Sequence, residues 1–369
     1  MKICILSMQR VHNFGSLLQA YSLKKMLEQL GHQVSFLDIE RNEADALLGG
    51  PEQKLTIGEV FLRKLQKIDR YAANRVACKI KNKQQDLRIF EFQKKVLGLD
   101  FQSNGKQYDC CVIGSDEVFN CMAASPWGFT GQLFGDVHQV DRVITYAASC
   151  GSTNWEEIPK PINDRIRNAF EKVSGFSVRD NNTLRMASNL TQRPVLVHLD
   201  PVLVGNFEEE IQNAPRPKDL PERYCVVYSY YNRICESEEI ASIQNFCKKH
   251  RMEIVTVGAP QMWVKHHCVM DPFAVPKVFA GAEFVVTDTF HGTLFSAKYA
   301  KRFAVKTRPS NQNKLGDLIQ RLAVQQHEVN SFLQLEAAYA KENDRKRIAE
   351  LCAAERERTI RYLRESVMA

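Results

Sequence analysis

A histidine with acidic, hydroxyl and glycine neighbours is the residue best suited to proton transfer. His291 lies in Thr287-Asp288-Thr289-Phe290-His291-Gly292-Thr293, a polar run between an apolar segment and a predicted helix. At such a turn an imidazole can hold a phosphate or deliver a proton near neutral pH. Gly292 permits close approach of a ligand, and the N–H and hydroxyl of Thr293 add donors for an anion. A lone histidine is usually structural, but this setting indicates a site.

Carboxylates and a guanidinium follow two further apolar runs. Gly114-Ser115-Asp116 ends one of them, where Asp116 could accept a proton from a substrate hydroxyl or could cap a helix together with Ser115. Arg179, in Ser177-Val178-Arg179-Asp180, ends the other. Its planar fork suits a carboxylate or a phosphate, and the alternative is an ion pair with Asp180 or another carboxylate.

A fourth candidate opens the first predicted helix. The small residues of Asn13-Phe14-Gly15-Ser16 would let a ligand approach backbone N–H groups at the positive end of the helix dipole. An N-cap followed by a turn explains the same residues equally well. A dinucleotide fingerprint has three glycines, whereas this segment has one. The segment therefore argues against a nicotinamide or flavin site.

Alternating apolar segments predict the elements that position these residues. Strands are expected at 2–6, 34–37, 110–113, 143–147 and 176–178, and then at 224–228, 253–257, 284–287 and 303–305. Helices are expected between the first two strands, at 236–250 and at 293–300. This alternation implies right-handed βαβ units and parallel sheets. Ligands bind at the carboxyl ends of parallel strands, which is where all four candidates fall.

The length of the chain and its prolines predict two domains. A chain of 369 residues is too long for one compact core. Pro215, Pro217 and Pro221 interrupt any regular element between two α/β sets. The predicted fold class is therefore α/β, with two Rossmann-like, doubly wound domains at 1–205 and 222–330. The second of these carries the His291 motif, and a helical segment follows at 331–369.

Composition excludes several classes of protein. Hydrophobic residues make up 44% and charged residues 25%, which is typical of a soluble globular chain and excludes collagen-like and disordered ones. No apolar stretch approaches the roughly 20 residues of a transmembrane helix. The eleven cysteines lack a Cys-x-x-Cys pair, and Cys4, Cys111 and Cys225 lie in apolar runs, which indicates buried thiols in the reducing cytoplasm. The run His266-His267-Cys268 lacks the spacing of metal ligands, so no metal is expected.

Most of the net charge is local. The net charge is +7, and residues 63–95 carry eleven basic against three acidic residues. Such a surplus can bind nucleic acid or an anionic membrane surface. No nucleic-acid motif accompanies it and apolar residues recur at helical spacing, so the solvated face of amphipathic helices is favoured and no nucleic-acid partner is expected. In the alternative, functional interpretation, residues 63–95 lie at the rim of the N-terminal domain and hold an anionic or lipid-linked glycan at the inner face of the membrane.

Taken together and in this order, the motifs resemble the polysaccharide pyruvyl transferase family. The matching stretches are Asn13 through Tyr21, Tyr108 through Asn120, Tyr146-Ala147-Ala148-Ser149, Ser177-Val178-Arg179-Asp180, Asp200-Pro201-Val202-Leu203 and Asp288 through Ser296. They span nearly the whole chain, and the closing helix at 358–367 also resembles the usual ending of the family. The resemblance implies that the two domains are of the GT-B type.

The resemblance also implies a donor and a reaction. Characterised members transfer the enolpyruvyl unit of phosphoenolpyruvate, a co-substrate and not a bound cofactor, to sugar hydroxyls of a polysaccharide or glycan precursor and form a pyruvate ketal. His291 and Asp116 are then the expected catalytic acid and base, and no metal or other cofactor is implied. The residues expected to bind substrate are Arg179, Asn13, Gly15, Ser115, Asp288, Thr289, Gly292 and Thr293.

One position departs from the family pattern. Members with demonstrated transfer commonly carry arginine two places before the motif histidine, where this chain has Thr289. Lys306 or Arg308, after the next strand, are the expected substitutes for that cation. Two other interpretations stay open at this point. One is a GT-B glycosyltransferase that uses a nucleotide-sugar, because a diphosphate also needs arginine and histidine, and the other is a non-catalytic glycan-binding relative.

Overall fold

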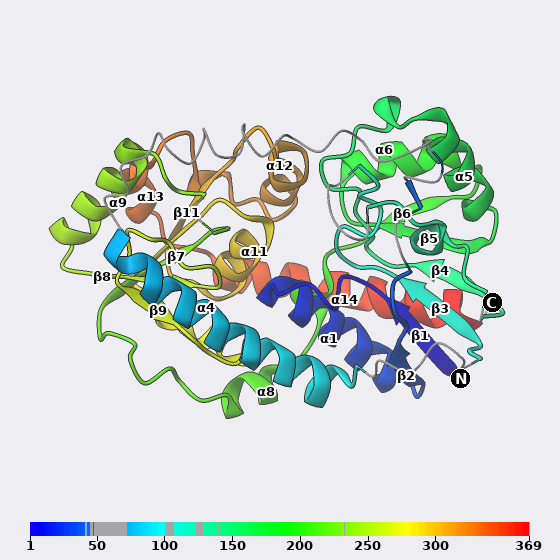
Figure 1. Ribbon diagram of the computed structural model, residues 1–369, viewed down its shortest axis with the longest axis horizontal. Helices are drawn as coiled ribbons and strands as arrows, with labels where there is room; N and C mark the ends of the chain where they lie inside the picture. The colour runs from blue at the N-terminus through cyan, green and yellow to red at the C-terminus, as the bar shows by residue number, and fades with distance from the viewer. Residues whose placement is uncertain are drawn as a thin grey trace.

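Two parallel β-sheets form the frame of the molecule (Figure 1). The computed structural model describes residues 1–40, 43, 44, 47, 72–99, 107–122, 128–138, 140–231 and 233–368. Within these residues each sheet has six strands, in the orders β2-β1-β3-β4-β5-β6 and β12-β11-β10-β7-β8-β9. The neighbouring strands of both sheets pair in parallel, which confirms the predicted α/β class.

The strands and helices alternate along the chain, as parallel pairing requires. The first sheet consists of β1 (Lys2–Leu6), β2 (Gln33–Phe36), β3 (Cys110–Ile113), β4 (Val143–Thr145), β5 (Val173–Val178) and β6 (Val195–Val197). The second consists of β7 (Tyr224–Tyr228), β8 (Glu253–Val257), β9 (His266–Cys268), β10 (Phe284–Thr287), β11 (Phe303–Lys306) and β12 (Glu328–Val329). The α-helices are α1 (Phe14–Gln29), α4 (Ala72–Phe92), α5 (Lys160–Phe170), α6 (Asn181–Leu190), α7 (Pro201–Val204), α8 (Glu208–Asn213), α9 (Ser237–Lys249), α10 (Val275–Gly281), α11 (Phe290–Tyr299), α12 (Gln312–Arg321), α13 (Leu335–Tyr339) and α14 (Arg345–Met368).

The central strands agree best with the sequence pattern. The predicted strands β1, β3, β7, β8 and β10 are confirmed at their predicted bounds. β3, β7 and β10 are buried along their whole length, because helices cover both faces of a parallel sheet. The apolar pattern does not predict β6, β9 and β12, since these short strands lie at sheet edges and are only partly buried.

Helix α11 begins earlier than the apolar spacing predicts. The predicted helix starts at residue 293, whereas α11 starts at Phe290 because the Thr289 side chain accepts a hydrogen bond from the Gly292 N–H at 3.0 Å. Thr289 is therefore the N-cap, and His291 lies in the first turn of the helix.

The C-terminal segment connects the two sheets. It is not one continuous helix from residue 333, because α13 ends at Tyr339 and α14 begins at Arg345. In Figure 1 α14, in red, runs from the second sheet towards the first. It packs on α11 and α7, and the Tyr362 hydroxyl donates to the Thr145 carbonyl at 2.8 Å. One apolar cluster accordingly includes buried side chains of both sheets, such as Ile3 and Val285.

The described part of the basic stretch lies mainly along the second sheet. Residues 63–71 are outside the described residues, and the remainder forms α4, which extends along the edge of the second sheet (Figure 1). Asn74 donates to the Met262 carbonyl at 2.9 Å, and the Gln85 amide bonds both backbone groups of Met270. The expected position at the N-terminal domain alone is therefore wrong for α4, because its polar side chains also pair with the backbone beside β9, while Asp86 pairs with His12 of the N-terminal half at 2.7 Å. No described helix is both long enough and apolar enough to span a bilayer.

The remaining cysteine and histidine predictions concern the core and the edge strand β9. Cys4, Cys111 and Cys225 are buried thiols, as expected, and no disulfide links them. His266 pairs with Glu253 at 2.9 Å, whereas His267 Nε2 lies 3.3 Å from Cys78 Sγ on α4. The neighbouring side chains of this strand thus have different partners, as the alternation of a strand predicts.

Candidate active site between the two sheets

The strand ends and helix starts of both sheets line a cavity of about 320 Å³ that contains several charged side chains, here named the His291 cavity. It lies where the carboxyl ends of β3 and β5 meet the first turns of α1 and α11. Its lining residues are Met8, Val11, Asn13, Ser16, Asp116, Glu117, Asn120, Gly128, Arg179, Tyr230, Phe290, His291 and Lys314. The structure therefore brings four predicted residues, Asn13, Asp116, Arg179 and His291, to one place.

Arg179 is held in the wall of this cavity by two carboxylates. Its side chain is 2% exposed, and Nη1 donates to Asp200 Oδ2 at 2.8 Å while Nη2 lies 3.7 Å from Asp116 Oδ1. Burial by itself would lower the pKa of Arg179, but the carboxylates of Asp200 and Asp116 raise it. The guanidinium also stacks on the Phe290 ring, with Cζ 4.0 Å from the ring centroid. Arg179 is therefore a fixed cation whose Nε has no hydrogen-bond partner among the described residues.

His291 shares a carboxylate with Arg179. Its Nε2 lies 3.7 Å from Asp200 Oδ2, which is longer than a hydrogen bond, and it has no hydrogen-bond partner in the described part of the chain. Burial by itself would raise the pKa of Asp200, but His291 and Arg179 lower it to about 2. Asp200 is thus a buried anion between two potential donors to a ligand.

Gly15 makes room for His291 and does not present its backbone to an open space. A Cβ built on Gly15 would lie 2.0 Å from His291 Cγ and 2.3 Å from Nδ1. The Gly15 N–H already donates to the Asn13 side chain at 2.8 Å. The imidazole therefore occupies the space that the sequence pattern assigns to a ligand, and Gly15 allows the start of α1 to contact α11.

We expect Gly15→Ala to be destabilised by about 1–3 kcal/mol, the usual cost of overpacking a buried contact, and to lose turnover because the imidazole is displaced. Urea unfolding and initial rates measure the two effects. Gly316→Ala, on α12, is the matched control, because a Cβ there meets nothing within 4 Å. A Gly15→Ala protein with wild-type stability and turnover would show that His291 is not held in this position.

Asp116 and Ser115 have different surroundings although they are neighbours. Asp116 lines the His291 cavity and accepts a hydrogen bond from the Ser16 hydroxyl at 2.5 Å. Ser115 is fully buried, and its hydroxyl donates to the Ala147 carbonyl at 3.0 Å and faces Asp200 at 3.4 Å. Asp116 is thus placed for contact with a ligand, whereas Ser115 supports the Asp200 carboxylate.

The remaining predicted residues of the α11 motif lie behind the cavity wall. Asp288 is fully buried and accepts hydrogen bonds from Ser229 at 2.6 Å and Arg308 at 2.5 Å. Thr293 is fully buried, and its hydroxyl donates to the Thr289 carbonyl at 2.9 Å. A Cβ on Gly292 would lie 2.1 Å from the Thr287 hydroxyl, so this glycine permits close packing of its own helix start.

Of the basic residues Lys306, Arg308 and Lys314, only Lys314 lines the His291 cavity. Lys306 and Arg308 both bond Glu239, at 2.7 and 3.1 Å, and neither lines the His291 cavity. Lys314, on α12, does line it and is paired with Glu117. Burial by itself would raise the pKa of Glu117, but the Lys314 ammonium and the Asn120 amide lower it. Lys306 and Arg308 are thus not among the residues that line this cavity, because Glu239 holds both side chains and Asp288 also holds Arg308.

Sequence reasoning assigned no site role to Asp200 or Lys314, whereas Ser16 was part of the predicted segment that opens α1. Asp200 begins a motif that matches the family. A carboxylate before Pro201 is typical of a helix cap, and Asp200 is indeed one, because its side chain accepts a hydrogen bond from the Val202 N–H at 3.0 Å. Lys314 stands in a polar helix with no local signal for function. Lys314 contacts Glu117, which lies 197 positions earlier in the sequence, and no local sequence pattern predicts a contact between residues so far apart.

Solved structures resemble this chain in fold. The UDP-GlcNAc 2-epimerase of Methanocaldococcus jannaschii, in complex with UDP-GlcNAc and UDP, has a TM-score of 0.51 at 11% identity, and the match covers 99% of this chain and 100% of that one. A glycosyltransferase of Streptomyces sp. SF2575 complexed with thymidine diphosphate has a TM-score of 0.43 at 13% identity, with 99% of each chain covered. At such identities the similarity shows the fold alone, which is the predicted two-domain GT-B type.

The curated proteins offer no match to this chain. The family model of the polysaccharide pyruvyl transferases, in contrast, matches residues 13–309. This range begins at Asn13, contains the ends of β3 and β5 and the whole α11 motif, and includes most residues of the His291 cavity. The chain therefore belongs to the polysaccharide pyruvyl transferase family.

Proposed function

We propose that this chain transfers the enolpyruvyl unit of phosphoenolpyruvate to sugar hydroxyls of a polysaccharide or glycan precursor and closes a pyruvate ketal. The observation that carries the proposal is a pair of buried nitrogen atoms, Arg179 Nε and His291 Nε2, on residues that line the His291 cavity. Neither atom has a hydrogen-bond partner among the described residues. Buried polar atoms are ordinarily paired, so both are suited to an anionic ligand.

The donor carries a carboxylate and a phosphate, and the cavity offers donors for both. The fork of Arg179 suits a planar carboxylate or phosphate, and the ammonium of Lys314 supplies a point charge. His291, in the first turn of α11, adds a third donor near the positive end of a helix dipole. No bound metal or other cofactor is needed in this assignment, because side chains supply the positive charge.

The reaction needs an acid at the donor and a base at the acceptor. His291 delivers a proton to the methylene carbon, which becomes a methyl group, and the neighbouring carbon becomes oxocarbenium-like. A sugar hydroxyl attacks that carbon and loses its proton to Asp116, while Asp200 and Glu117, whose pKa values lie below their ordinary range, remain ionised nearby. A second hydroxyl of the same sugar then displaces the phosphate, which leaves with the remaining proton.

We expect phosphoenolpyruvate to raise the thermal midpoint of the protein. A ligand at about 100 times its Kd stabilises the folded state by about 2.7 kcal/mol, which corresponds to a shift of several degrees. The shift should persist in a chelator, since the cations of the cavity are side chains. Inorganic sulfate at equal ionic strength controls for unspecific anion binding. A shift with UDP and none with phosphoenolpyruvate would instead favour a nucleotide-sugar glycosyltransferase, and a shift with a glycan alone would favour a non-catalytic relative.

We further propose that the reaction takes place in the cytoplasm at the inner face of the membrane, where α4 contacts the lipid. Four apolar side chains of α4, Val76, Ile80, Leu87 and Phe90, are 64, 53, 59 and 48% exposed. Their spacing places them on one face of the helix, opposite the buried face that carries Ile89. Exposed lysines accompany this face, which is the pattern of a helix that binds an anionic lipid surface.

Vesicle co-sedimentation tests the lipid contact. We expect the protein to sediment with vesicles that contain phosphatidylglycerol, less so at high salt, and not with pure phosphatidylcholine. Replacing Leu87 and Phe90 together by serine should weaken the partition roughly tenfold or more, because two buried apolar side chains are lost. Leu333→Ser, at a residue that is 66% exposed elsewhere, is the control. Equal binding of the two vesicle types would contradict the charge-dependent contact.

A further inference from the structure

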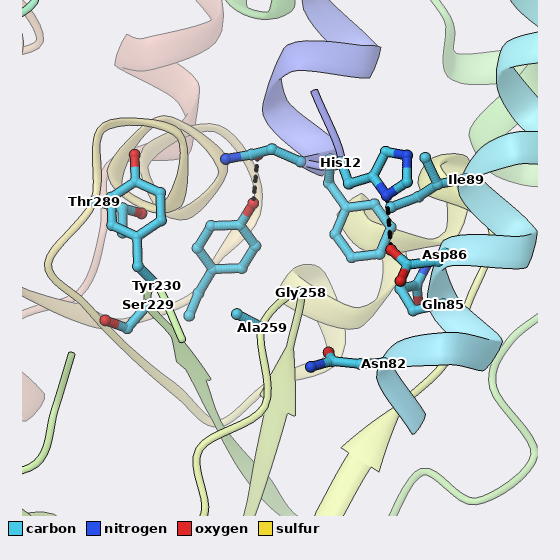
Figure 2. Close-up of a pocket in the computed structure, with 13 residues that line it drawn as sticks. His12, Asn82, Gln85, Asp86, Ile89, Ser229, Tyr230, Gly258, Ala259 and Thr289 are labelled. Carbon is cyan, nitrogen blue, oxygen red and sulfur yellow. Dashed lines mark hydrogen bonds and ion pairs between the residues drawn. The ribbon is translucent and has the colours of Figure 1, made fainter. Parts of the chain in front are cut away.

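A second cavity adjoins the His291 cavity. It has a volume of about 130 Å³ and lies between α4 and the carboxyl ends of β7 and β8, beside Thr289, the N-cap of α11 (Figure 2). We name it the α4 cavity. Asn13 and Tyr230 line both cavities, so these two side chains form a shared wall. A ligand in the α4 cavity would therefore lie next to a donor in the His291 cavity.

The charges of the two cavities differ. Arg179 and Lys314 line the His291 cavity, whereas no lysine or arginine is among the described residues that line the α4 cavity. The ionisable side chains of the α4 cavity are His12, Asp86 and two tyrosines, and His12 Nδ1 is paired with Asp86 Oδ1 at 2.7 Å (Figure 2). A diphosphate needs fixed cations, which this cavity lacks, and a carboxylate on its wall opposes anions. An uncharged ligand is therefore favoured.

The polar groups of the α4 cavity suit hydroxyl groups. The Asn82 amide and the Tyr230 hydroxyl have no hydrogen-bond partner in the described part of the chain, and an amide offers both donors and an acceptor. In Figure 2 the Asn82 side chain points from α4 towards the side of the cavity that Gly258 and Ala259 form. The ring of Tyr230 is 43% exposed in total and offers an apolar face. An amide and an aromatic ring in one cavity can bind a sugar ring by its hydroxyls and its C–H face.

Thr289 adds no charge to the α4 cavity and leaves its space open. Its hydroxyl is already engaged as the N-cap acceptor of the Gly292 N–H, and its side chain is 4% exposed. The α4 cavity, with a volume of about 130 Å³, is smaller than the His291 cavity of about 320 Å³, which favours a compact ligand. Gln85 is not free for a ligand either, because its amide holds Met270, so α4 is fixed as one wall.

From these observations we infer that the α4 cavity is the acceptor subsite and that it binds one uncharged pyranose ring of the glycan. The inference rests on the proposed function, since it places the sugar next to the donor across the wall of Asn13 and Tyr230. A hydroxyl of that ring would enter the His291 cavity beside Asp116, the assigned base. The outward face of α4 carries the exposed apolar residues, so a lipid-linked glycan would enter along the same helix.

Saturation-transfer NMR with methyl glycosides tests the acceptor subsite. The probes are the methyl galactoside, glucoside and mannoside, each added to the full chain with phosphoenolpyruvate present. We expect saturation of at least one glycoside, and its loss in Ala259→Trp, which fills the cavity, and in Asn82→Ala, which removes the amide. Gln84→Ala, an exposed neighbour on α4 that does not line the cavity, should keep the signal.

The thermal shift with phosphoenolpyruvate is recorded on the same variants, so that the two proposals fail separately. Loss of the glycoside signal with an unchanged donor shift supports the subsite. A glycoside signal that survives both Ala259→Trp and Asn82→Ala, or no signal with any probe in the wild type, would overturn it. Stabilisation by UDP that disappears in Ala259→Trp would show that the cavity binds a nucleotide. Absence of the donor shift in the wild type would overturn the proposed function itself.

Discussion

Replacing His291 by glutamine should lower turnover by about 10²–10⁴, the usual contribution of general acid catalysis, while donor affinity changes much less. Glutamine keeps a hydrogen-bond donor near Asp200 but has no proton to deliver to the methylene carbon. The buried Nε2 of His291 lies 3.7 Å from the Asp200 carboxylate and has no hydrogen-bond partner among the described residues. The measurement is phosphate release from phosphoenolpyruvate with a glycoside acceptor at saturating donor, together with the thermal shift that the donor produces.

The control for this substitution is His138→Gln, because the His138 side chain is 72% exposed and lies outside the His291 cavity. It should leave both measurements unchanged. Near-normal turnover of His291→Gln with weaker donor binding would show that His291 is an anchor. The acid would then have to be sought at Asp116, Glu117 or Asp288. Of these, Glu117 is a poor donor of a proton because Lys314 lowers its pKa, and Asp288 does not line the cavity.

Replacing Arg179 by alanine should affect both donor binding and folding. The donor loses about 2–4 kcal/mol of binding free energy, as expected for one partner of a buried charged pair. The folded state loses roughly 3–5 kcal/mol, because Asp200 and Asp116 are left without the cation that lies 2.8 and 3.7 Å away. Calorimetric titration with phosphoenolpyruvate and urea unfolding measure the two losses.

Arg179→Lys separates the two effects. Lysine keeps a positive charge near Asp200, so most of the stability should return, but it lacks the planar fork and should bind the donor more weakly than the wild type. Arg185→Ala, an exposed arginine on α6, is the control for loss of a basic residue and should be neutral in both assays. Wild-type donor affinity in both Arg179 variants would remove Arg179 from the donor site.

The amino-acid sequence by itself determined the central strands and the polar residues at their ends. β1, β3, β7, β8 and β10 are short, apolar and bounded by turn residues, so local composition is enough to place them. The edge strands β6, β9 and β12 have no such pattern because each is short and only partly buried. The order of the motifs along the chain likewise identified the family, because each motif is a short stretch of residues and the motifs follow one another in a fixed order.

Only the tertiary structure decided what these residues touch. The sequence around Gly15 indicates an open anion site. In the structure Gly15 packs against the imidazole of His291, which lies more than half of the chain away in sequence. The sequence indicates that Asp288 contacts a ligand, but Ser229 and Arg308 each donate a hydrogen bond to one of its oxygens. Lys314, which the sequence does not single out, places a positive charge in the His291 cavity. Strand crossovers and the course of α4 and α14 bring these residues together, and the contacts form between elements that are distant in sequence. Periodicity reports which face of an element is buried, and it carries no information on the element that covers that face.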